Sequence, residues 1–193
     1  MSADLLRLAV IIGSVREGRF GPVVARWFAH EARMDGQFDV DVIDLAEANL
    51  PPVLTEDFPP ERTALQPRLA AADAFVLVTP EYNRGYPASV KNLIDWYLEE
   101  WQAKPVGFVS YGHRAGGLRS VDHLGSVLVD LHAVPLRDSV SFHNAWDLFD
   151  GYDENDPDRM PQDTRAAAKL LLDRLRWWAT ALRDARRARP YNA

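Results

Sequence analysis

The sequence predicts an α/β domain in which a parallel sheet is covered by helices on both faces. Short apolar runs rich in β-branched residues alternate with stretches of helical periodicity, and the alternation repeats five times. Continuous apolar runs are typical of strands buried on both faces, and their alternation with helices favours a parallel sheet. The sequence contains no internal repeat, low-complexity tract or linker, so residues 1–193 are expected to form a single domain.

Five strands are expected, and the first is the apolar run 8–12. The segment 38–45 alternates apolar and polar residues before it becomes fully apolar, which indicates a strand near the edge of the sheet. Two further buried strands are predicted at 75–79 and 105–110. The last strand is expected within 133–142, at about 134–136 and 140–142.

Helices are expected between and after these strands. The first begins at Pro22, because proline is favoured at the first helical position, and it ends before Gly36. The other predicted helices are 61–72, 89–101, 118–132 and 164–188. The proline-rich segment 49–60 is expected to be a loop, because residues that precede prolines are disfavoured in helices.

The acidic segment 145–163 is expected to be irregular and solvated. Its carboxylates suggest calcium, but a calcium loop starting at Asp150 would need glycine and glutamate where the chain has Asn155 and Pro161. We therefore predict no metal site.

Composition excludes several classes of function. The chain has no cysteine, so it forms no disulfide, cysteine-ligated metal site or catalytic thiol. Its net charge of −6 argues against general nucleic-acid binding. No apolar run approaches the roughly 18 residues that span a bilayer, and no signal peptide is recognisable. We therefore expect a soluble cytoplasmic protein that binds neither nucleic acid nor membrane.

The first loop, residues 13–21, has the composition of a phosphate-binding loop. It holds three glycines, Ser14, Arg16 and Arg19 between a buried strand and a helix. Backbone N–H groups at a helix N-terminus favour an anion, and arginine side chains bind phosphate oxygens in a planar fork. The alternative is an ordinary turn between strand and helix whose arginines face solvent.

Two familiar phosphate motifs do not match this loop. Glycines at 13, 18 and 21 do not give the G-x-G-x-x-G spacing of dinucleotide-binding proteins. Gly13 and Gly18 have the spacing of the P-loop, but Arg19 and Phe20 follow where that motif has lysine and a hydroxyl residue.

Two more loops are expected beside the first. In parallel sheets, ligands bind at the carboxyl ends of the strands. The second loop, residues 80–87, and the third loop, residues 110–117, end predicted strands there and are rich in glycine or polar residues. Three such loops at one edge indicate a ligand site more strongly than one motif does.

The string Thr79-Pro80-Glu81-Tyr82-Asn83, continued by Lys91-Asn92-Leu93-Ile94-Asp95-Trp96, resembles the NAD(P)H-dependent FMN reductase family. Gly13-Ser14-Val15-Arg16 and Ser110-Tyr111-Gly112 add to the resemblance, which runs from about Leu8 to about Val129. It implies a flavodoxin-like fold with strand order 2-1-3-4-5, FMN as cofactor, and NADPH or NADH as cosubstrate. It also implies a quinone-like or other small electron acceptor, and a homodimer or homotetramer with the flavin near a subunit boundary.

The resemblance assigns roles to individual residues. Ser14 and Arg16 would hold the FMN phosphate with backbone N–H groups through Phe20, the second loop would lie along the isoalloxazine ring, and the third would pass its other edge. The predicted cofactor-binding residues are Gly13, Ser14, Arg16, Arg19, Phe20, Pro80, Glu81, Tyr82, Asn83, Arg84, Ser110, Gly112 and Gly116. Hydride transfer needs no side-chain acid or base, so no catalytic residue is predicted. Asn92, Asp95 and Trp96 are expected to fix the loop and the packing.

The first loop departs from the family pattern, which often has serine and asparagine where this chain has Arg19 and Gly21. Arg19 could bind the FMN phosphate, or it could face the 2′-phosphate of NADPH, for which Arg84 and Arg114 are further candidates. His113 could lie over the flavin or be an ordinary hydrogen-bonded loop residue.

Two other functions compete with a reductase. A flavodoxin-type carrier would bind FMN but pass single electrons to a protein partner. A flavin-free α/β protein would use the same loops to bind a phosphate ester.

Overall fold

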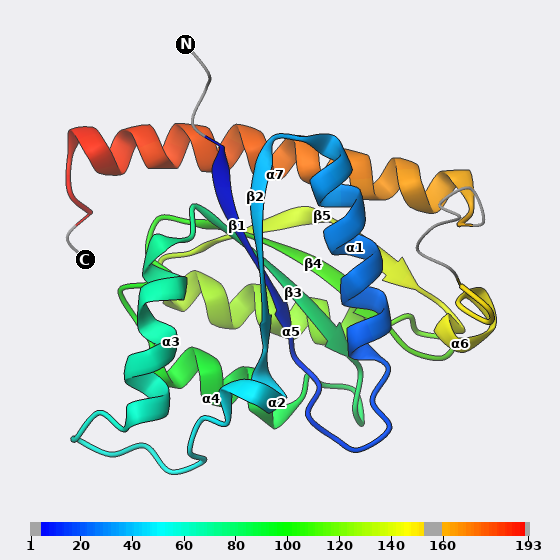
Figure 1. The fold of residues 1–193 in the computed structure, drawn as a ribbon, viewed down its shortest axis with the longest axis horizontal. Coiled ribbons are helices and arrows are strands. Elements are labelled where there is room, and N and C mark those ends of the chain that lie inside the picture. The colour runs from blue at the N-terminus through cyan, green and yellow to red at the C-terminus, as the bar shows by residue number, and fades with distance from the viewer. Residues whose placement is uncertain (1–4, 153–159, 192–193) are drawn as a thin grey trace.

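The computed structural model describes residues 5–152 and 160–191 and confirms the expected fold (Figure 1). A five-stranded parallel sheet has the order β2-β1-β3-β4-β5. The strands are β1 (Leu6–Ile12), β2 (Phe38–Asp44), β3 (Ala74–Pro80), β4 (Pro105–Tyr111) and β5 (Val134–Phe142). The segment that alternates in hydropathy, β2, lies at an edge of the sheet, as predicted.

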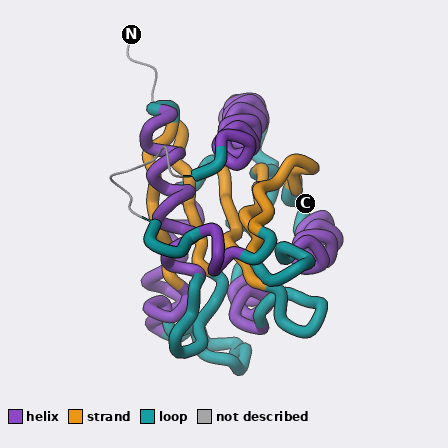
Figure 2. Tube along the Cα trace, turned by 90° about the vertical axis from the view of Figure 1, so that its right-hand side faces the viewer, coloured by secondary structure: helices purple, strands orange, loops and turns teal. Residues whose placement is uncertain are grey.

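Helices cover both faces of the sheet, as Figure 2 shows from the side. One face packs against α1 (Gly21–Asp35) and α7 (Gln162–Ala188). The other packs against α3 (Pro60–Ala71), α4 (Ala88–Trp96) and α5 (Leu118–Asp130). Two single-turn helices, α2 (Leu45–Ala48) and α6 (Ala145–Leu148), follow the two edge strands.

The apolar run of β1 divides between two cores. Leu8 and Val10 pack toward α1 and α7, while Ala9 and Ile11 pack toward the opposite helices. Successive strand residues point to opposite faces, so a strand covered on both faces needs apolar residues at every position. All seven residues of β3 are buried for the same reason.

Most element boundaries lie within two residues of the sequence prediction, and two elements differ by more. The helix expected over 89–101 ends at Trp96, because Tyr97 turns to extended backbone and its buried hydroxyl donates to the carbonyl of Arg62 at 2.8 Å. The strand segments predicted at 134–136 and 140–142 form one continuous strand, β5. Its register with β4 shifts between Val106 and Phe108.

The acidic segment contains the short helix α6, which the sequence analysis did not predict. Asn155, which occupies the glycine position of the calcium-loop pattern, lies outside the described residues, so the prediction of no metal site in this segment stays a prediction. In the described ranges 5–152 and 160–191, no helix is both long and apolar enough to cross a membrane.

Lys104 is buried at the amino end of β4. Its ammonium group donates to the carbonyls of Leu69 and Ala70, both at 3.0 Å, and so satisfies the last turn of α3. Burial lowers the pKa of Lys104 to about 8, because the surrounding core disfavours the charged form.

This burial predicts a pH-dependent stability. Between pH 8 and about pH 10 the unfolded chain binds the Lys104 proton more tightly than the folded chain, so the free energy of unfolding rises with pH. Two tyrosines with pKa raised to about 12, Tyr97 and Tyr111, act oppositely from about pH 9, where unfolded tyrosines begin to ionise, and offset part of the rise at pH 10. Urea unfolding at pH 8, 9 and 10 will show a rise on the order of 2 kcal/mol that Lys104→Met removes. Equal slopes in the two proteins would refute this.

Candidate functional site

The three loops predicted to bind a ligand lie together at the carboxyl edge of the sheet. They follow β1, β3 and β4, which are neighbours in the strand order. In Figure 1 the first loop is the dark blue segment between the arrowhead of β1 and the start of α1. Tyr111 reaches from the third loop to the first, where its hydroxyl donates to Ser14 Oγ at 3.2 Å. Arg16 reaches from the first loop to the second, with its guanidinium carbon 5.8 Å from the Tyr82 ring centre.

The first loop presents backbone donors without acceptors. Within the part of the chain that the structure describes, no backbone N–H of residues 14–20 has a hydrogen-bond partner. The loop leads into the 15-residue helix α1, whose first turn carries neither a side-chain cap nor an acidic residue. Such a helix N-terminus is electrostatically suited to an anion.

The closed end of this loop is packed tightly around Ser14. Ser14 is fully buried, and because its oxygen accepts from Tyr111, its own hydroxyl proton remains free to donate. Burial raises the pKa of Tyr111 to about 12, so Tyr111 stays neutral and keeps this proton. A Cβ on Gly21 would overlap Ser14 Oγ and lie 3.0 Å from both Ile12 and the Tyr111 hydroxyl. Gly21 is therefore required by close packing.

Arg19 ties the first loop to the end of β2. Its two terminal nitrogens donate to the Asp44 carboxylate at 2.7 and 2.6 Å, and one of them also donates to the Ser14 carbonyl at 3.1 Å. The side chains of Arg19 and Asp44 are only 19% and 12% exposed, and their hydrogen bond raises the pKa of Arg19. The pair thus fixes the backbone on both sides of Arg16, and a direct contact of Arg19 with cofactor stays a prediction.

The second loop forms a tight hairpin. Tyr82 and Gly85 exchange backbone hydrogen bonds at 2.8 and 3.0 Å, and the two residues between them, Asn83 and Arg84, both have positive φ, at 49° and 72°. Positive φ at both central residues is typical of the two-residue turns that match strand twist. Among the described residues, the N–H groups of Asn83 and Arg84 lack partners.

Residues of α5 hold the start of this second loop. Arg119 donates to the Glu81 carboxylate at 2.6 Å, and the hydroxyl of Ser120 donates to the Pro80 carbonyl at 2.9 Å. The carboxylate of Glu81 is therefore paired with Arg119.

The third loop is held by two serines. The hydroxyls of Ser110 and Ser141 both donate to the carbonyl of Gly116 at 2.7 Å. Gly116 has φ of 58°, and a Cβ there would overlap Ser141, so glycine is needed for both conformation and space. A hollow of about 530 Å³ lies between Glu81 and residues 112–117 of this loop, with Arg119 and Asn144 also in its wall.

Aromatic side chains brace the loops from the side of α6. Phe20, at the end of the first loop, lies with its ring centre 6.0 Å from Tyr111, 5.7 Å from Trp146 and 5.6 Å from Phe149. His113 stacks against Trp146 at 4.5 Å between ring centres. Nothing in this packing decides between His113 over the flavin and His113 as an ordinary loop residue.

Two of the helix residues expected to fix the second loop are bonded to a different loop. Asn92 donates to the carbonyls of Leu50 and Pro51, and Trp96 donates to that of Pro51 at 2.9 Å, so α4 fixes the loop 49–59. Asp95 instead pairs with Lys91 on the surface of the same helix.

Sequence reasoning missed Asp44, Arg119 and Trp146 as residues of this edge. Asp44 ends an edge strand, which was the one available signal that it lies near the first loop. Arg119 and Trp146 reach the site only through the packing of α5 and α6, which no local pattern encodes.

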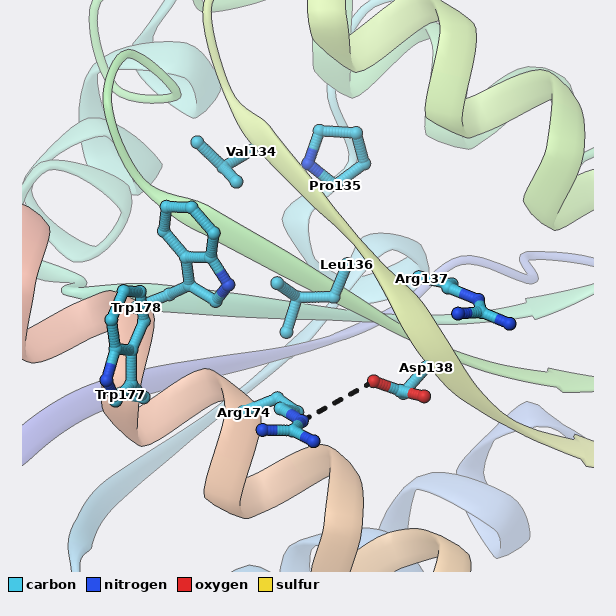
Figure 3. Close-up of a pocket in the computed structure, with 8 residues that line it drawn as sticks. All are labelled: Val134, Pro135, Leu136, Arg137, Asp138, Arg174, Trp177 and Trp178. Carbon is cyan, nitrogen blue, oxygen red and sulfur yellow. Dashed lines mark ion pairs between the residues drawn. The ribbon is translucent and has the colours of Figure 1, made fainter.

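A second hollow, of about 550 Å³, lies at the outer edge of the sheet between β5 and α7 (Figure 3). Its wall contains Trp177, Trp178 and the ion pair Arg174–Asp138, which spans 3.7 Å. None of the thirteen predicted cofactor-binding residues lines it.

The donor set at the carboxyl edge fits FMN. A phosphate needs several N–H donors at a helix N-terminus, and the first loop leaves seven consecutive N–H groups free among the described residues. The edges of an isoalloxazine ring carry carbonyl and nitrogen acceptors, and the N–H groups at 83, 113–115 and 117 have no acceptor within residues 5–152 and 160–191. The sheet order and these loops define a flavodoxin-like protein built to hold a phosphorylated, acceptor-rich ligand.

Comparison with known proteins gives the family. The profile of the NADPH-dependent FMN reductase family matches residues 6–147, so the chain belongs to this family. It is 39% identical over 120 residues to an NAD(P)H-dependent FMN reductase of Schizosaccharomyces pombe, an alignment that covers 58% of this chain and 60% of that protein. It is 31% identical over 142 residues to a quinone reductase of Escherichia coli, covering 70% of this chain and 76% of that one.

Solved structures confirm the fold. The flavoenzyme NAD(P)H:(acceptor) oxidoreductase FerB of Paracoccus denitrificans superposes with a TM-score of 0.65 at 22% identity, over 93% of this chain and 98% of that chain. This likeness supports the flavodoxin-like fold.

The packing around Gly21 yields a test of the first loop. Gly21→Ala will displace Ser14 and the Tyr111 hydroxyl and weaken FMN binding by at least about tenfold, as overpacking by a methyl group costs about 1–3 kcal/mol. The matched control is Gly125→Ala on α5, where a Cβ meets nothing within 4 Å. Flavin fluorescence titration measures both variants. Equal FMN affinities in the two would show that the Ser14 pocket does not hold the phosphate.

Proposed function

We propose that this chain is an FMN-dependent NAD(P)H oxidoreductase that passes electrons to a quinone or another small acceptor. The observation that supports it most directly is the set of backbone donors, free of acceptors among the described residues, in all three loops at one edge of the sheet. The family match and the names of the relatives agree with this chemistry.

In this proposal the first loop anchors the phosphate. Ser14 donates its free hydroxyl proton, Arg16 supplies the charge, and the N–H groups through Phe20 complete the cradle. Arg16 is exposed and faces only the Tyr82 ring in the described structure, so its guanidinium is available to phosphate oxygens. Ser14 lies at the buried end of this loop, packed against Gly21, so its hydroxyl marks how deep the phosphate enters.

The second and third loops orient the ring. The hairpin of Tyr82 and Gly85 holds the N–H of Asn83 outward, and Ser110 with Ser141 fixes the third loop opposite it. Pre-positioned donors of this kind need no rearrangement when charge develops on a ligand. When bound, FMN supplies the hydride-accepting and electron-donating chemistry that these side chains lack.

No side chain is assigned as a proton donor or acceptor. Tyr111 is neutral below about pH 12 and is committed to Ser14, while Glu81 is committed to Arg119. In this proposal the residues of the edge therefore bind and orient, and none is assigned a catalytic role.

We also propose a homodimer or homotetramer in the cytoplasm. The loop 49–59 exposes Val53, Leu54 and Phe58, which are 68%, 51% and 64% exposed. Apolar side chains gathered on one loop favour a surface that a second copy covers. Light scattering of the purified protein tests the assembly, and a monomer at micromolar concentration would contradict it.

The function is tested by visible absorption spectroscopy. The purified protein, loaded with FMN if necessary, will show a flavin band that anaerobic NADPH or NADH bleaches, and added quinone will restore the band with one quinone consumed per nicotinamide. A bound flavin that resists both nicotinamides would support the electron-carrier function instead. Failure to bind FMN at all would support the flavin-free alternative.

A further inference from the structure

The rim of the hollow at the third loop carries an exposed aromatic pair. His113 and Trp146 stack with 4.5 Å between ring centres and 33° between ring planes. Both side chains are exposed, Trp146 by 39%, although an indole is usually buried. An exposed flat aromatic surface beside a ligand hollow is suited to stacking of a nucleobase.

The backbone holds this pair in place. The carbonyl of His113 accepts from the N–H groups of Gly116 and Asn144, and the N–H of Ala145 donates to the Gly112 carbonyl at 3.2 Å. These bonds clamp the third loop to the start of α6, which carries Trp146. The stacked pair of His113 and Trp146, called the platform below, is therefore formed before any ligand binds. Ligand binding then costs little conformational entropy at this surface.

Arg114 lies next to His113 in the third loop, and its guanidinium has no ion-pair partner among the described residues. His143 Nδ1 lies 2.8 Å from the Arg114 carbonyl, and since a carbonyl only accepts, Nδ1 is the protonated nitrogen and donates to it. The guanidinium itself is exposed and has no ion pair or hydrogen bond among the described residues. The positive charge of Arg114 is therefore available to an anionic ligand.

The other arginines of the edge are less available for a second phosphate. Arg19 is paired with Asp44, and Arg119 is paired with Glu81. Arg16 belongs to the first loop and the proposed FMN phosphate. Arg84 has no ion pair with any residue in 5–152 or 160–191, but it lies in the hairpin turn of the second loop and does not line the hollow that Arg114 and His113 share with Glu81.

We propose that His113, Arg114 and Trp146 form the subsite for the adenosine 2′-phosphate of NADPH, with Arg114 as the residue that selects NADPH over NADH. The proposal rests on the proposed function, and it assigns the adenosine half of NADPH to the rim of this hollow. The purine stacks on the aromatic pair, and the guanidinium binds the phosphomonoester through charge-assisted hydrogen bonds. The hollow, which reaches Glu81 in the second loop, gives the rest of the dinucleotide a path toward the ring site.

The probe is adenosine 2′,5′-bisphosphate, compared with adenosine 5′-monophosphate, which lacks the 2′-phosphate. Calorimetric titration of the FMN-loaded chain will show tighter binding of the bisphosphate. Arg114→Gln will weaken it by about tenfold or more and will remove most of the difference between the two probes. Arg137→Gln on β5, an exposed arginine in the wall of the other hollow, is the charge-matched control and will bind as the unaltered protein does.

The aromatic pair is tested separately. Trp146→Ala will weaken both probes by about tenfold, since the base stacks in each, whereas Trp146→Phe will retain most of the affinity. The ratio of kcat/KM for NADPH to that for NADH will fall in Arg114→Gln and stay near its original value in Arg84→Gln.

Three results would overturn the proposal. They are equal affinity for the two probes, equal loss in Arg114→Gln and Arg137→Gln, or a fall in the NADPH preference only in Arg84→Gln. The calorimetric titration can also be run on flavin-free chain, because the platform is formed by backbone bonds of the protein alone. Failure of FMN to bind is therefore distinguishable from failure of this subsite.

Discussion

The ion pair between Arg19 and Asp44 joins the first loop to the sheet, and the geometry of the candidate site depends on it. Among the described residues, no backbone N–H of residues 14–20 donates a hydrogen bond, so side chains contribute to holding this loop. Arg19 does this from two sides, through the Asp44 carboxylate and the Ser14 carbonyl. A loop held by its side chains can keep its N–H groups unpaired and available, which an anion site requires.

The same arrangement recurs in the other two loops. Ser120 and Arg119 hold the second loop, and Ser110 and Ser141 hold the third, in each case with part of the backbone left free to donate. The rigid sheet sets the spacing of the three loops, because β1, β3 and β4 are adjacent in it. The fold thus creates a row of fixed donors, and a cofactor with a phosphate at one end and ring acceptors at the other matches that row.

The sequence was sufficient to predict the sheet, the edge position of β2 and the three loops, because hydropathy alternation and turn residues are local signals. It was not sufficient for the partner of Arg19, because Asp44 lies 25 residues away and meets it only in the folded chain. The end of α4 was missed for a related reason, since Tyr97 leaves the helix to reach Arg62 across the core. The stacking of His113 on Trp146 depends on backbone hydrogen bonds between the third loop and the start of α6. No sequence motif predicts these long-range bonds.

The most direct test of this account is a double-mutant cycle on FMN affinity, with Arg19→Gln, Asp44→Asn and the combined variant, each titrated with FMN and with riboflavin. If the pair positions the loop, both single variants will weaken FMN several-fold, the double variant will be little worse than either, and riboflavin will change much less. If Arg19 instead binds the phosphate directly, Asp44→Asn will free it and leave FMN affinity equal or higher, while Arg19→Gln weakens FMN regardless of Asp44. That second pattern would contradict the account.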